Sequence, residues 1–434
     1  MKEYWDKKLE TMPLKELEKF QLDHLKKTIQ KAYEKIPFYQ DKFDEIGIRP
    51  KDIKKLSDLA KLPFTQKTDL RDYYPSGFLA VQMNKVSKIH ASSGTTGKPI
   101  VSFYTPTDID KWAECVARKM VAAGISSDDV FQIALGMGLF TGGLGYYHGA
   151  LKVGAMIVPT ATGQTERQIM LMQDFQTTAF TSTPSYAITI AERAKEMGIS
   201  LNKLHLRVGI IGAEPFSDEM RKEIEVKMGI KAFDGYGLTE LCGPGVAYEC
   251  QEQNGLHINE DHFIPEIIDP SSGQVLPLGT IGELVLTSIQ REAMPMIRFR
   301  TRDITSLRRE KCECGRTLIK MTRVQGRTDD MLIIGGVNVF PSQIESLLFD
   351  FKEIEPQYII YIRKKGHLDS LHVDVEAKQE LYEGSSEKII ELENRISNHL
   401  REMIGISIKV RLLPPKSIAR SEGKVKRVID ERSK

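Results

Sequence analysis

Residues 206–214 have the sequence LRVGIIGAE, a short apolar run that ends in small residues and one acid. Such a run is typical of a buried strand. Four similar runs lie nearby in the chain: VFQIALGM (130–137), GAMIVPTA (154–161), TTAFTSTP (177–184) and IKAFDGYG (230–237). Helix-like segments at 165–175, 185–198 and 217–229 lie between them. Because strands that alternate with helices form parallel β-α-β units, the sequence predicts an α/β fold whose ligands bind beyond the strand ends.

The segments on either side of this centre have a different pattern. Up to about residue 75, apolar residues recur at helical spacing, which predicts helices. After about Gly326, strand-like runs at 331–336, 357–366, 371–378 and 408–415 accompany helix-like runs at 342–351 and 386–405. We therefore expect a large N-terminal domain at 1–326 and a small α+β domain at 327–434, joined by a hinge in GRTDD (326–330).

Composition excludes several classes of protein. The 434 residues are 41% hydrophobic and 28% charged, and the net charge of +2 is not gathered in blocks, so neither nucleic acid nor an acidic membrane is an expected partner. Residues 130–151 carry no charge and are numerous enough to span a bilayer, but their glycines favour a strand that runs into a glycine loop. The charged start MKEYWDKKLE does not resemble a signal peptide, and five sparse cysteines indicate a reducing compartment, so we expect a cytoplasmic protein.

The stretch ASSGTTGKP (91–99) has the glycines, hydroxyls and lysine of a phosphate-binding loop. It is not the NTPase loop G-x-x-x-x-G-K-[ST], because Ser92 stands where the first glycine should be and Pro99 where the magnesium-binding hydroxyl should be. The following IVSFYT alternates like a strand rather than a helix. The stretch therefore joins two strands, either as a phosphate clasp or as a plain hairpin tip.

Six motifs occur in the order seen in adenylate-forming enzymes: SSGTTGKP (92–99), GAEP (212–215), YGLTE (236–240), FRTRD (299–303), GRTDD (326–330) and SEGKVKR (421–427). Within that superfamily the chain resembles the phenylacetate–CoA ligase family, over essentially its whole length. The resemblance implies a large domain with parallel β-α-β sheets and a small β-barrel-like part, followed by a mobile lid domain. It also implies a reaction in two halves: ATP and a carboxylate give an acyl-adenylate, and coenzyme A then displaces AMP.

The resemblance assigns roles to particular residues. Thr239 would bond the α-phosphate, Glu240 would bind Mg²⁺, and Asp303 would accept both ribose hydroxyls. Asp329 matches the hinge, and Arg327 is expected near the ribose or phosphate. The remaining nucleotide-binding set comprises Ser92, Ser93, Gly94, Thr95, Thr96, Gly97 and Lys98 over the outer phosphates, and Gly212, Ala213, Glu214, Asp234, Gly235, Tyr236 and Gly237 around the adenine.

Some assignments have simpler alternatives. Asp303 and Arg302 could form an exposed ion pair, and Tyr236 could be a core residue. Lys424 matches the catalytic lysine that would stabilise the adenylation transition state, although Lys426 lies only two residues away. Because Lys424 lies on the small domain, adenylation needs that domain closed over the site, and thioester formation is expected to follow its rotation.

A zinc site is expected from two pairs of residues. Cys312 and Cys314 form a tight thiolate pair, and Cys250 with His257 forms the second pair. Three cysteines and one histidine make a closed structural zinc site rather than a catalytic one. Cys242 is an alternative to Cys250, His262 is a weaker candidate ligand, and four unrelated reduced residues are the other interpretation.

The acyl pocket is expected from 136–145 and the strand ends at 212–214 and 235–238, with Met137, Phe140, Gly142 and Gly143 as its named residues. The phenylacetate enzymes have GYG where this chain has Gly136-Met137-Gly138, which bears on the identity of the acid. The sequence therefore predicts an AMP-forming ligase that uses ATP, Mg²⁺, coenzyme A and an aryl acid. The alternatives are an enzyme that loads a carrier protein and a non-catalytic nucleotide-binding protein; family habit suggests a homodimer.

Overall fold

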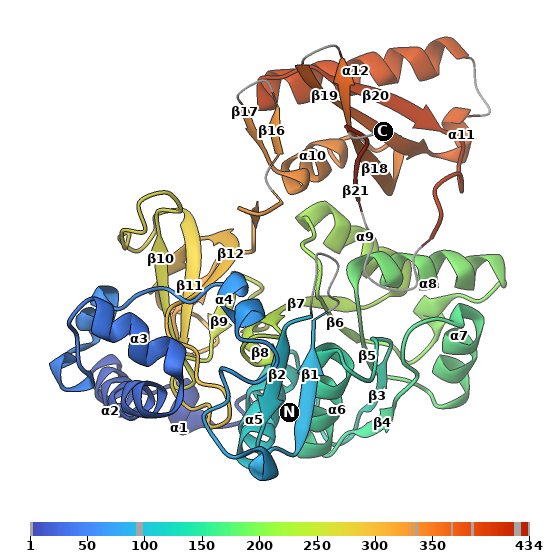
Figure 1. Ribbon diagram of the computed structural model, residues 1–434. Helices are drawn as coiled ribbons and strands as arrows, with labels where there is room; N and C mark the ends of the chain where they lie inside the picture. Colours follow the sequence, from blue (N-terminus) through green and yellow to red (C-terminus); the bar gives the residue numbers. More distant parts are fainter. Residues whose placement is uncertain are drawn as a thin grey trace.

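The computed structural model describes residues 3–92, 99–330, 332–334, 337–365, 368–382, 386–420 and 427–432. At its centre is a mixed sheet in the order β13-β14-β9-β8-β7-β6-β5-β3-β4 (Figure 1). The five predicted runs form its parallel half, which comprises β3 (Val130–Ile133), β4 (Met156–Val158), β5 (Ala179–Ser182), β6 (Val208–Gly212) and β7 (Lys231–Leu238). The α/β prediction is thus confirmed.

The other half of this sheet is antiparallel, which the sequence pattern did not predict. It contains β8 (Gly243–Glu249), β9 (Leu256–Ile258), β13 (Leu307–Arg308) and β14 (Lys320–Met321). The chain turns back after β7, so β8 pairs with it without a crossover helix. Strands of two or three residues carry too little periodicity to be recognised in a sequence.

Helices cover both faces of the parallel half. They are α5 (Pro106–Ala122), α6 (Thr141–Val153), α7 (Thr165–Asp174), α8 (Pro184–Glu196) and α9 (Asp218–Met228). Three of them begin at a hydroxyl cap: the side chains of Thr105, Thr183 and Ser217 each accept a backbone N–H from the first turn. Gly229 ends α9 in the left-handed conformation.

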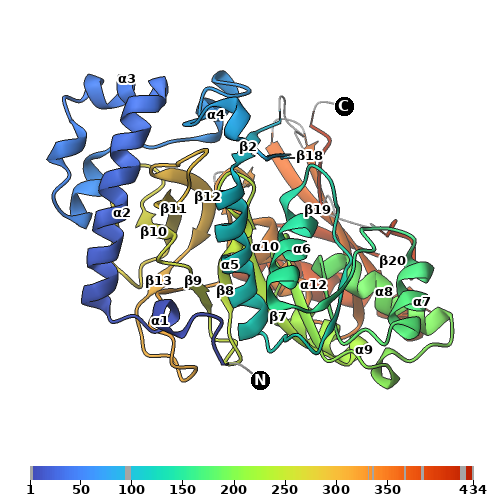
Figure 2. The ribbon, with the colours of Figure 1, turned by 90° about the horizontal axis from the view of Figure 1, so that it is seen from below.

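The predicted glycine loop after β3 is wrong in its second half, because Thr141 begins α6. The glycines instead allow α6 to approach α5 and β8 closely. A Cβ at Gly145 would lie 2.6 Å from Trp112 and 2.7 Å from Pro244, and one at Gly149 would lie 2.5 Å from Val116. Figure 2 shows α5 and α6 side by side.

The N-terminal helices precede this sheet, as predicted. They are α1 (Lys7–Glu10), α2 (Leu14–Lys35), α3 (Pro37–Glu45) and α4 (Lys67–Asp72), with short 3-10 turns at 50–52, 56–61, 83–85 and, later in the chain, 201–203. Pro37 begins α3 at its first position, where a missing N–H costs nothing. The hairpin of β1 (Lys88–Ala91) and β2 (Val101–Tyr104) confirms that 91–99 joins two strands.

A separate antiparallel sheet provides the small all-β part. It contains β10 (Phe263–Ile268), β11 (Gly282–Ser288), β12 (Phe299–Thr305) and β15 (Gly326–Arg327) in that order. Figure 1 shows it in yellow and orange beside the N-terminal helices. Since β15 includes Arg327, the proposed boundary between 326 and 327 cuts a strand of this sheet.

The C-terminal part has its own sheet and core. Its elements are β16 (Leu332–Ile334), β17 (Val337–Val339), α10 (Pro341–Leu348), β18 (Ile354–Lys365), β19 (Leu368–Ala377), α11 (Gln379–Tyr382), α12 (Ser386–Ile404), β20 (Ile408–Leu413) and β21 (Val428–Asp430). The sheet order is β20-β19-β18-β21, and Ile360, Val373 and Ile396 lie in its core. Residues 337–339 form β17, which pairs antiparallel with β16. No helix of the described residues could cross a bilayer.

Candidate active site and metal centre

The GAEP and YGLTE segments lie side by side at the carboxyl ends of β6 and β7. Gly212 and Gly235 are register partners, as are Ile211 and Asp234. Ala213 has a φ of +69°, a strained backbone conformation of the kind found at functional sites. Glu214 accepts a hydrogen bond from Ser185 Oγ at 2.8 Å. These segments therefore form the strand-end site that the sequence predicted.

Tyr236, Asp303 and Arg327 meet at this site. Tyr236 Oη donates to Asp303 Oδ2 at 2.5 Å, and Arg327 donates from Nη1 to Oδ1 at 2.7 Å. Asp303 is 6% exposed, and burial raises the pKa of its carboxyl while the Arg327 guanidinium opposes the rise. The strands fix this pair, because Asp303 and Arg327 are partners in the β12–β15 ladder.

The alternative of an exposed Asp303–Arg302 pair is wrong. Arg302 donates to the side chain of Gln66 and lies 3.7 Å from Glu283. Arg327 also holds Asp329, through contacts of 2.9 and 3.0 Å. The Arg327 guanidinium thus joins the predicted ribose acid Asp303 to the predicted hinge acid Asp329, and Tyr236 is joined to both through Asp303.

Glu240, the predicted magnesium ligand, is 3% exposed and faces Lys67 of α4, whose Nζ lies 3.6 Å from Oε1. Its neighbour Thr239 follows the end of β7. Sequence reasoning did not identify Lys67, because this lysine at the start of α4 is distant in sequence from Glu240 and gives no local signal of the contact.

The base of the 91–99 hairpin contacts the predicted acyl segment. Ser92 Oγ accepts the backbone N–H of Ile100 at 2.9 Å, and Ala91 donates its N–H to the Leu139 carbonyl at 2.9 Å. Phe140 is 49% exposed beside this contact, and Met137 packs on Gly143. The predicted phosphate residues Ser93, Gly94, Thr95, Thr96, Gly97 and Lys98 lie outside the described residues.

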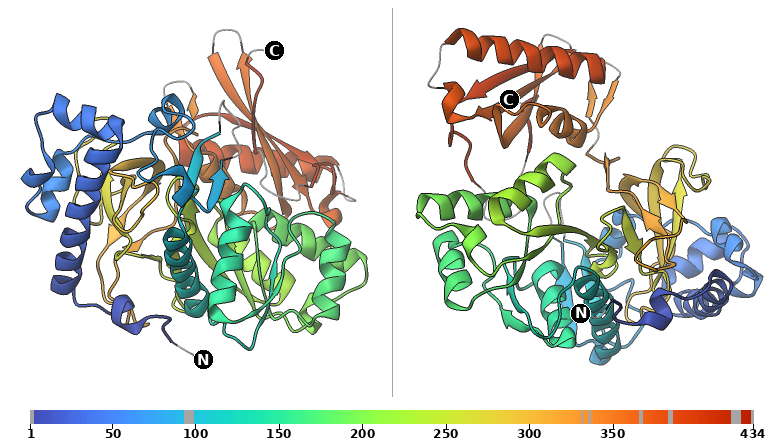
Figure 3. Two further views of the ribbon diagram at one scale, coloured as in Figure 1. Left: turned by 60° about the horizontal axis from the view of Figure 1, so that its bottom comes forward. Right: turned by 180° about the vertical axis from the view of Figure 1, so that it is seen from behind.

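Lys424 and Lys426 also lie outside the described residues, but both flanks of their segment contact α8. Arg420 Nε lies 3.0 Å from Glu192, and Arg427 Nη2 lies 3.5 Å from Ser185 Oγ. Ser185 is the residue that donates to Glu214. The C-terminal part therefore lies over the strand-end site, as the views in Figure 3 also show.

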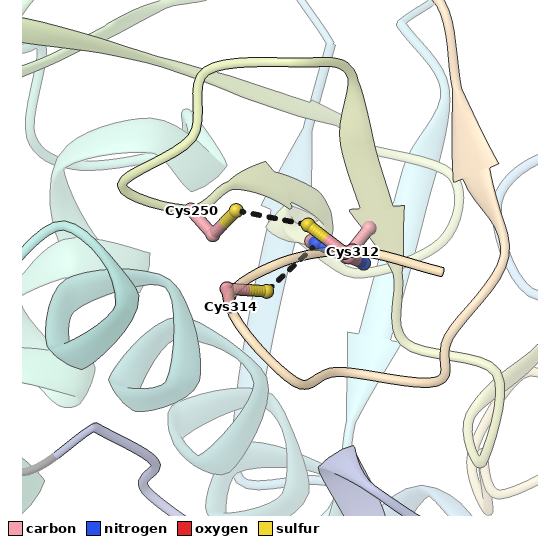
Figure 4. Close-up of side chains that lie close together, drawn as sticks. Cys250, Cys312 and Cys314 are labelled. Carbon is pink, nitrogen blue, oxygen red and sulfur yellow. Dashed lines mark hydrogen bonds between the residues drawn. The ribbon is translucent and has the colours of Figure 1, made fainter. Parts of the chain in front are cut away.

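The four predicted zinc ligands form one cluster (Figure 4), in which all ligand atoms lie within 4.8 Å of one another. Cys250 Sγ lies 3.7 Å from Cys312 Sγ, and Cys314 Sγ lies 3.5 Å from His257 Nε2. In a tetrahedral zinc site with usual bond lengths, the S–S and S–N edges come to about 3.8 and about 3.5 Å. These two donor pairs therefore have about the spacing expected of a tetrahedral zinc site.

The surroundings of the cluster favour a metal ligand set. His257 Nδ1 lies 3.3 Å from the Leu318 carbonyl, which leaves Nε2 for a metal. Hydrogen bonding from Cys250, together with His257, lowers the pKa of the Cys314 thiol and so favours the thiolate. Among the described residues Cys242 and His262 are not in the cluster, so both alternatives to the predicted set are wrong.

Comparisons with known proteins agree with this geometry. The family model described as AMP-binding enzyme matches residues 22–291, and the AMP-binding enzyme C-terminal domain matches 336–432. Phenylacetate-coenzyme A ligase from Thermus thermophilus is 45% identical, with 98% of each chain covered. The protein of the same name from Aromatoleum evansii is 49% identical over 96% of this chain and 95% of its own.

A solved 2-hydroxyisobutyryl-CoA ligase reproduces the arrangement of the two parts. In the postadenylation state with 2-HIB-AMP its TM-score is 0.94, at 29% identity over 99% of this chain and 93% of that one. In the thioesterification state the TM-score falls to 0.73, at 30% identity over 100% and 93%. The arrangement of the two parts in the present chain is therefore more similar to the postadenylation structure of that protein than to its thioesterification structure. Its motifs, fold and near-full-length identity place it in the AMP-binding enzyme family, among the phenylacetate–coenzyme A ligases.

Proposed function

We propose that the protein joins an aryl acid, phenylacetate or a similar one, to coenzyme A at the expense of ATP. The observation that carries this proposal is the convergence of Tyr236, Asp303 and Arg327 beside the GAEP segment, in a chain whose relatives are phenylacetate–CoA ligases. In the first half-reaction a carboxylate oxygen attacks the α-phosphorus, and the bond to the β-phosphate oxygen breaks to release pyrophosphate. In the second, coenzyme A thiolate attacks the acyl carbon, and AMP leaves with the electron pair.

The described residues support a division of roles. Asp303 would accept the ribose hydroxyls, since Tyr236 and Arg327 fix its carboxylate, and the Tyr236 ring would stack on the adenine. Glu240 would hold Mg²⁺. Its buried carboxylate is paired with the Lys67 ammonium, and a metal cation could replace this ammonium as the counter-charge. Mg²⁺ there would neutralise charge on the departing pyrophosphate.

The second half-reaction would need a different position of the C-terminal part. We take residues 1–326 and 327–434 as the two units and Asp329 as the pivot, because Arg327 is fixed to Asp303 and holds Asp329. We also propose that the protein is a homodimer and that it is located in the cytoplasm. The free cysteines are consistent with a reducing compartment.

ATP–pyrophosphate exchange tests the reaction class. With phenylacetate, benzoate and indoleacetate as the panel, we expect acid-dependent exchange with at least one acid and AMP release that requires coenzyme A. AMP release that does not depend on coenzyme A, in a protein that shows exchange, would favour transfer to a carrier protein. Absence of exchange with every aryl acid, in protein shown to be folded, would contradict the enzyme itself.

We propose that Cys250, His257, Cys312 and Cys314 hold one structural Zn²⁺. Replacing Cys312 with serine should lower zinc from about one per chain to below about 0.1, as measured by elemental analysis. The melting temperature should fall by about 5–15 °C, because the site links β9 to the loop before β14 and metal binding contributes directly to folding.

The matched control for this zinc experiment is Cys115→Ala, which removes a buried cysteine outside the cluster. It should leave the zinc content unchanged even if packing costs some stability. Purified wild type without zinc, and unable to take it up on addition, would refute the site.

A further inference from the structure

A lysine is buried behind the strand that carries Tyr236. Lys119 lies on α5 and is 1% exposed. Its ammonium donates to the Pro244 carbonyl and lies 5.7 Å from the centre of the Tyr146 ring. Among the described residues, no carboxylate oxygen lies within 4.0 Å of its Nζ. An ammonium has three donors, so a single carbonyl uses only part of its capacity.

Gly235 leaves room for this ammonium. A Cβ at position 235 would lie 2.7 Å from Lys119 Nζ and 3.1 Å from the Tyr146 hydroxyl. Both donors therefore face the bare backbone of β7 next to Tyr236. Gly212 is the register partner of Gly235, so two neighbouring strand ends lack side chains here. Gly212 and Gly235 belong to the segments from which the acyl pocket is expected (136–145, 212–214 and 235–238), so Lys119 and Tyr146 lie against a strand end that would form one wall of that pocket.

The free-energy cost of burying the Lys119 ammonium indicates a role beyond packing. Burial lowers the pKa of Lys119 to about 7, so keeping the ammonium charged in this position is unfavourable. An apolar side chain of similar length would fill the same space without that cost. The geometry instead keeps an amine and a phenol hydroxyl together against the backbone of Gly235.

We propose that Lys119 and Tyr146 bind an oxygen atom at the end of the substrate remote from the reacting carboxylate. The acid would then be an aryl acid with a hydroxyl, carbonyl or second carboxylate group on the ring. This inference rests on the proposed function and deepens it by naming the class of acid. A plain phenyl ring would leave the remaining donor capacity of the Lys119 ammonium, which already donates to the Pro244 carbonyl, without a partner, and a site built around a polar group discriminates strongly against such an analogue.

The test is ATP–pyrophosphate exchange with phenylacetate, 3-hydroxyphenylacetate, 4-hydroxyphenylacetate and 4-carboxyphenylacetate. In the wild type, kcat/KM for the best oxygen-bearing acid should exceed that for phenylacetate by about tenfold or more. Lys119→Met should reduce this ratio by about tenfold or more, mainly through the oxygen-bearing acid. Tyr146→Phe should reduce it in the same direction.

Lys111→Met is the matched control, because Lys111 also lies on α5 and donates to a backbone carbonyl, that of Gln290 at 3.0 Å. It should leave the ratio unchanged. A wild type that prefers phenylacetate, or a Lys119→Met variant that slows every acid equally, would overturn the inference and restrict Lys119 to holding Pro244. The wild-type panel decides even if the variant does not fold. Absence of exchange with every acid would instead remove the proposed function.

Discussion

Lys424→Ala should lower the rate of adenylation by about a hundredfold to a thousandfold, the usual loss when one charge-stabilising donor is removed from a transition state. Negative charge develops between the attacking carboxylate and the α-phosphate in the transition state, and we propose that the Lys424 ammonium stabilises it. The flanking residues Arg420 and Arg427 contact α8, whose Ser185 donates to Glu214. The residues on both sides of the segment that carries Lys424 therefore contact α8, and Arg427 does so beside the partner of Glu214.

Two measurements separate this role from a general defect. Pyrophosphate exchange should be lost in Lys424→Ala, while thioester formation from supplied acyl-AMP and coenzyme A should stay near the wild-type rate. Lys426→Ala is the matched control, and it should retain exchange. The opposite outcome for the two variants would assign catalysis to Lys426.

Asp303→Ala should reduce kcat/KM for ATP by about a hundredfold or more. The substitution removes the proposed ribose acceptor and leaves the guanidinium of Arg327 and the hydroxyl of Tyr236 without their buried partner. Breaking a buried charge pair from one side costs about 3–5 kcal/mol, part of which should appear as lower stability. AMP binding measured by calorimetry and exchange measured against ATP concentration should both show the defect.

Asp330→Ala is the control for Asp303→Ala, since Asp330 is an exposed acid that also lies 3.4 Å from Arg327. Exposed pairs contribute little, so its effect should be less than about threefold. Asp303→Asn, which keeps the shape but not the charge, should be intermediate. Normal AMP affinity in Asp303→Ala would contradict the ribose role.

The sequence sufficed to predict the five strands of the parallel half of the main sheet, because apolar runs with helices between them form parallel β-α-β units, but it did not predict their order β7-β6-β5-β3-β4. The antiparallel half could not be predicted: β9 and β14 are three and two residues long, and their pairing depends on contacts distant in sequence. The glycines of α6 led to the wrong prediction of a loop there, for a physical reason. Glycine is typical of loops, yet at Gly145 and Gly149 it permits close packing between helices, which only the partner helix reveals.

The candidate site was predictable in its members but not in its contacts. Motif order identified Tyr236, Asp303 and Arg327, whereas the hydrogen bonds that join them depend on the β12–β15 ladder. The zinc set could be predicted because thiolates and imidazole are distinctive ligands. Lys119 was missed although it stands within the apolar stretch VARKMVAA; a lysine in a helix is ordinarily solvated, and only its burial distinguishes it.

The contacts of Arg420 affect how the enzyme could pass between its two half-reactions. This residue binds Glu192 across the two parts at 3.0 Å, but also binds Glu376 of its own part at 2.7 and 2.9 Å. In the proposed rotation of the C-terminal part, Arg420 would keep the buried Glu376 and release only Glu192. Two further ion pairs across this surface among the described residues, Lys416–Glu196 and Lys227–Glu355, are exposed or half-buried and contribute at most about 1 kcal/mol each. Because breaking these contacts costs little free energy, the bound ligand can determine the position of the C-terminal part in every catalytic cycle. Added salt should weaken the ion pairs and shift the equilibrium towards the position in which they are broken.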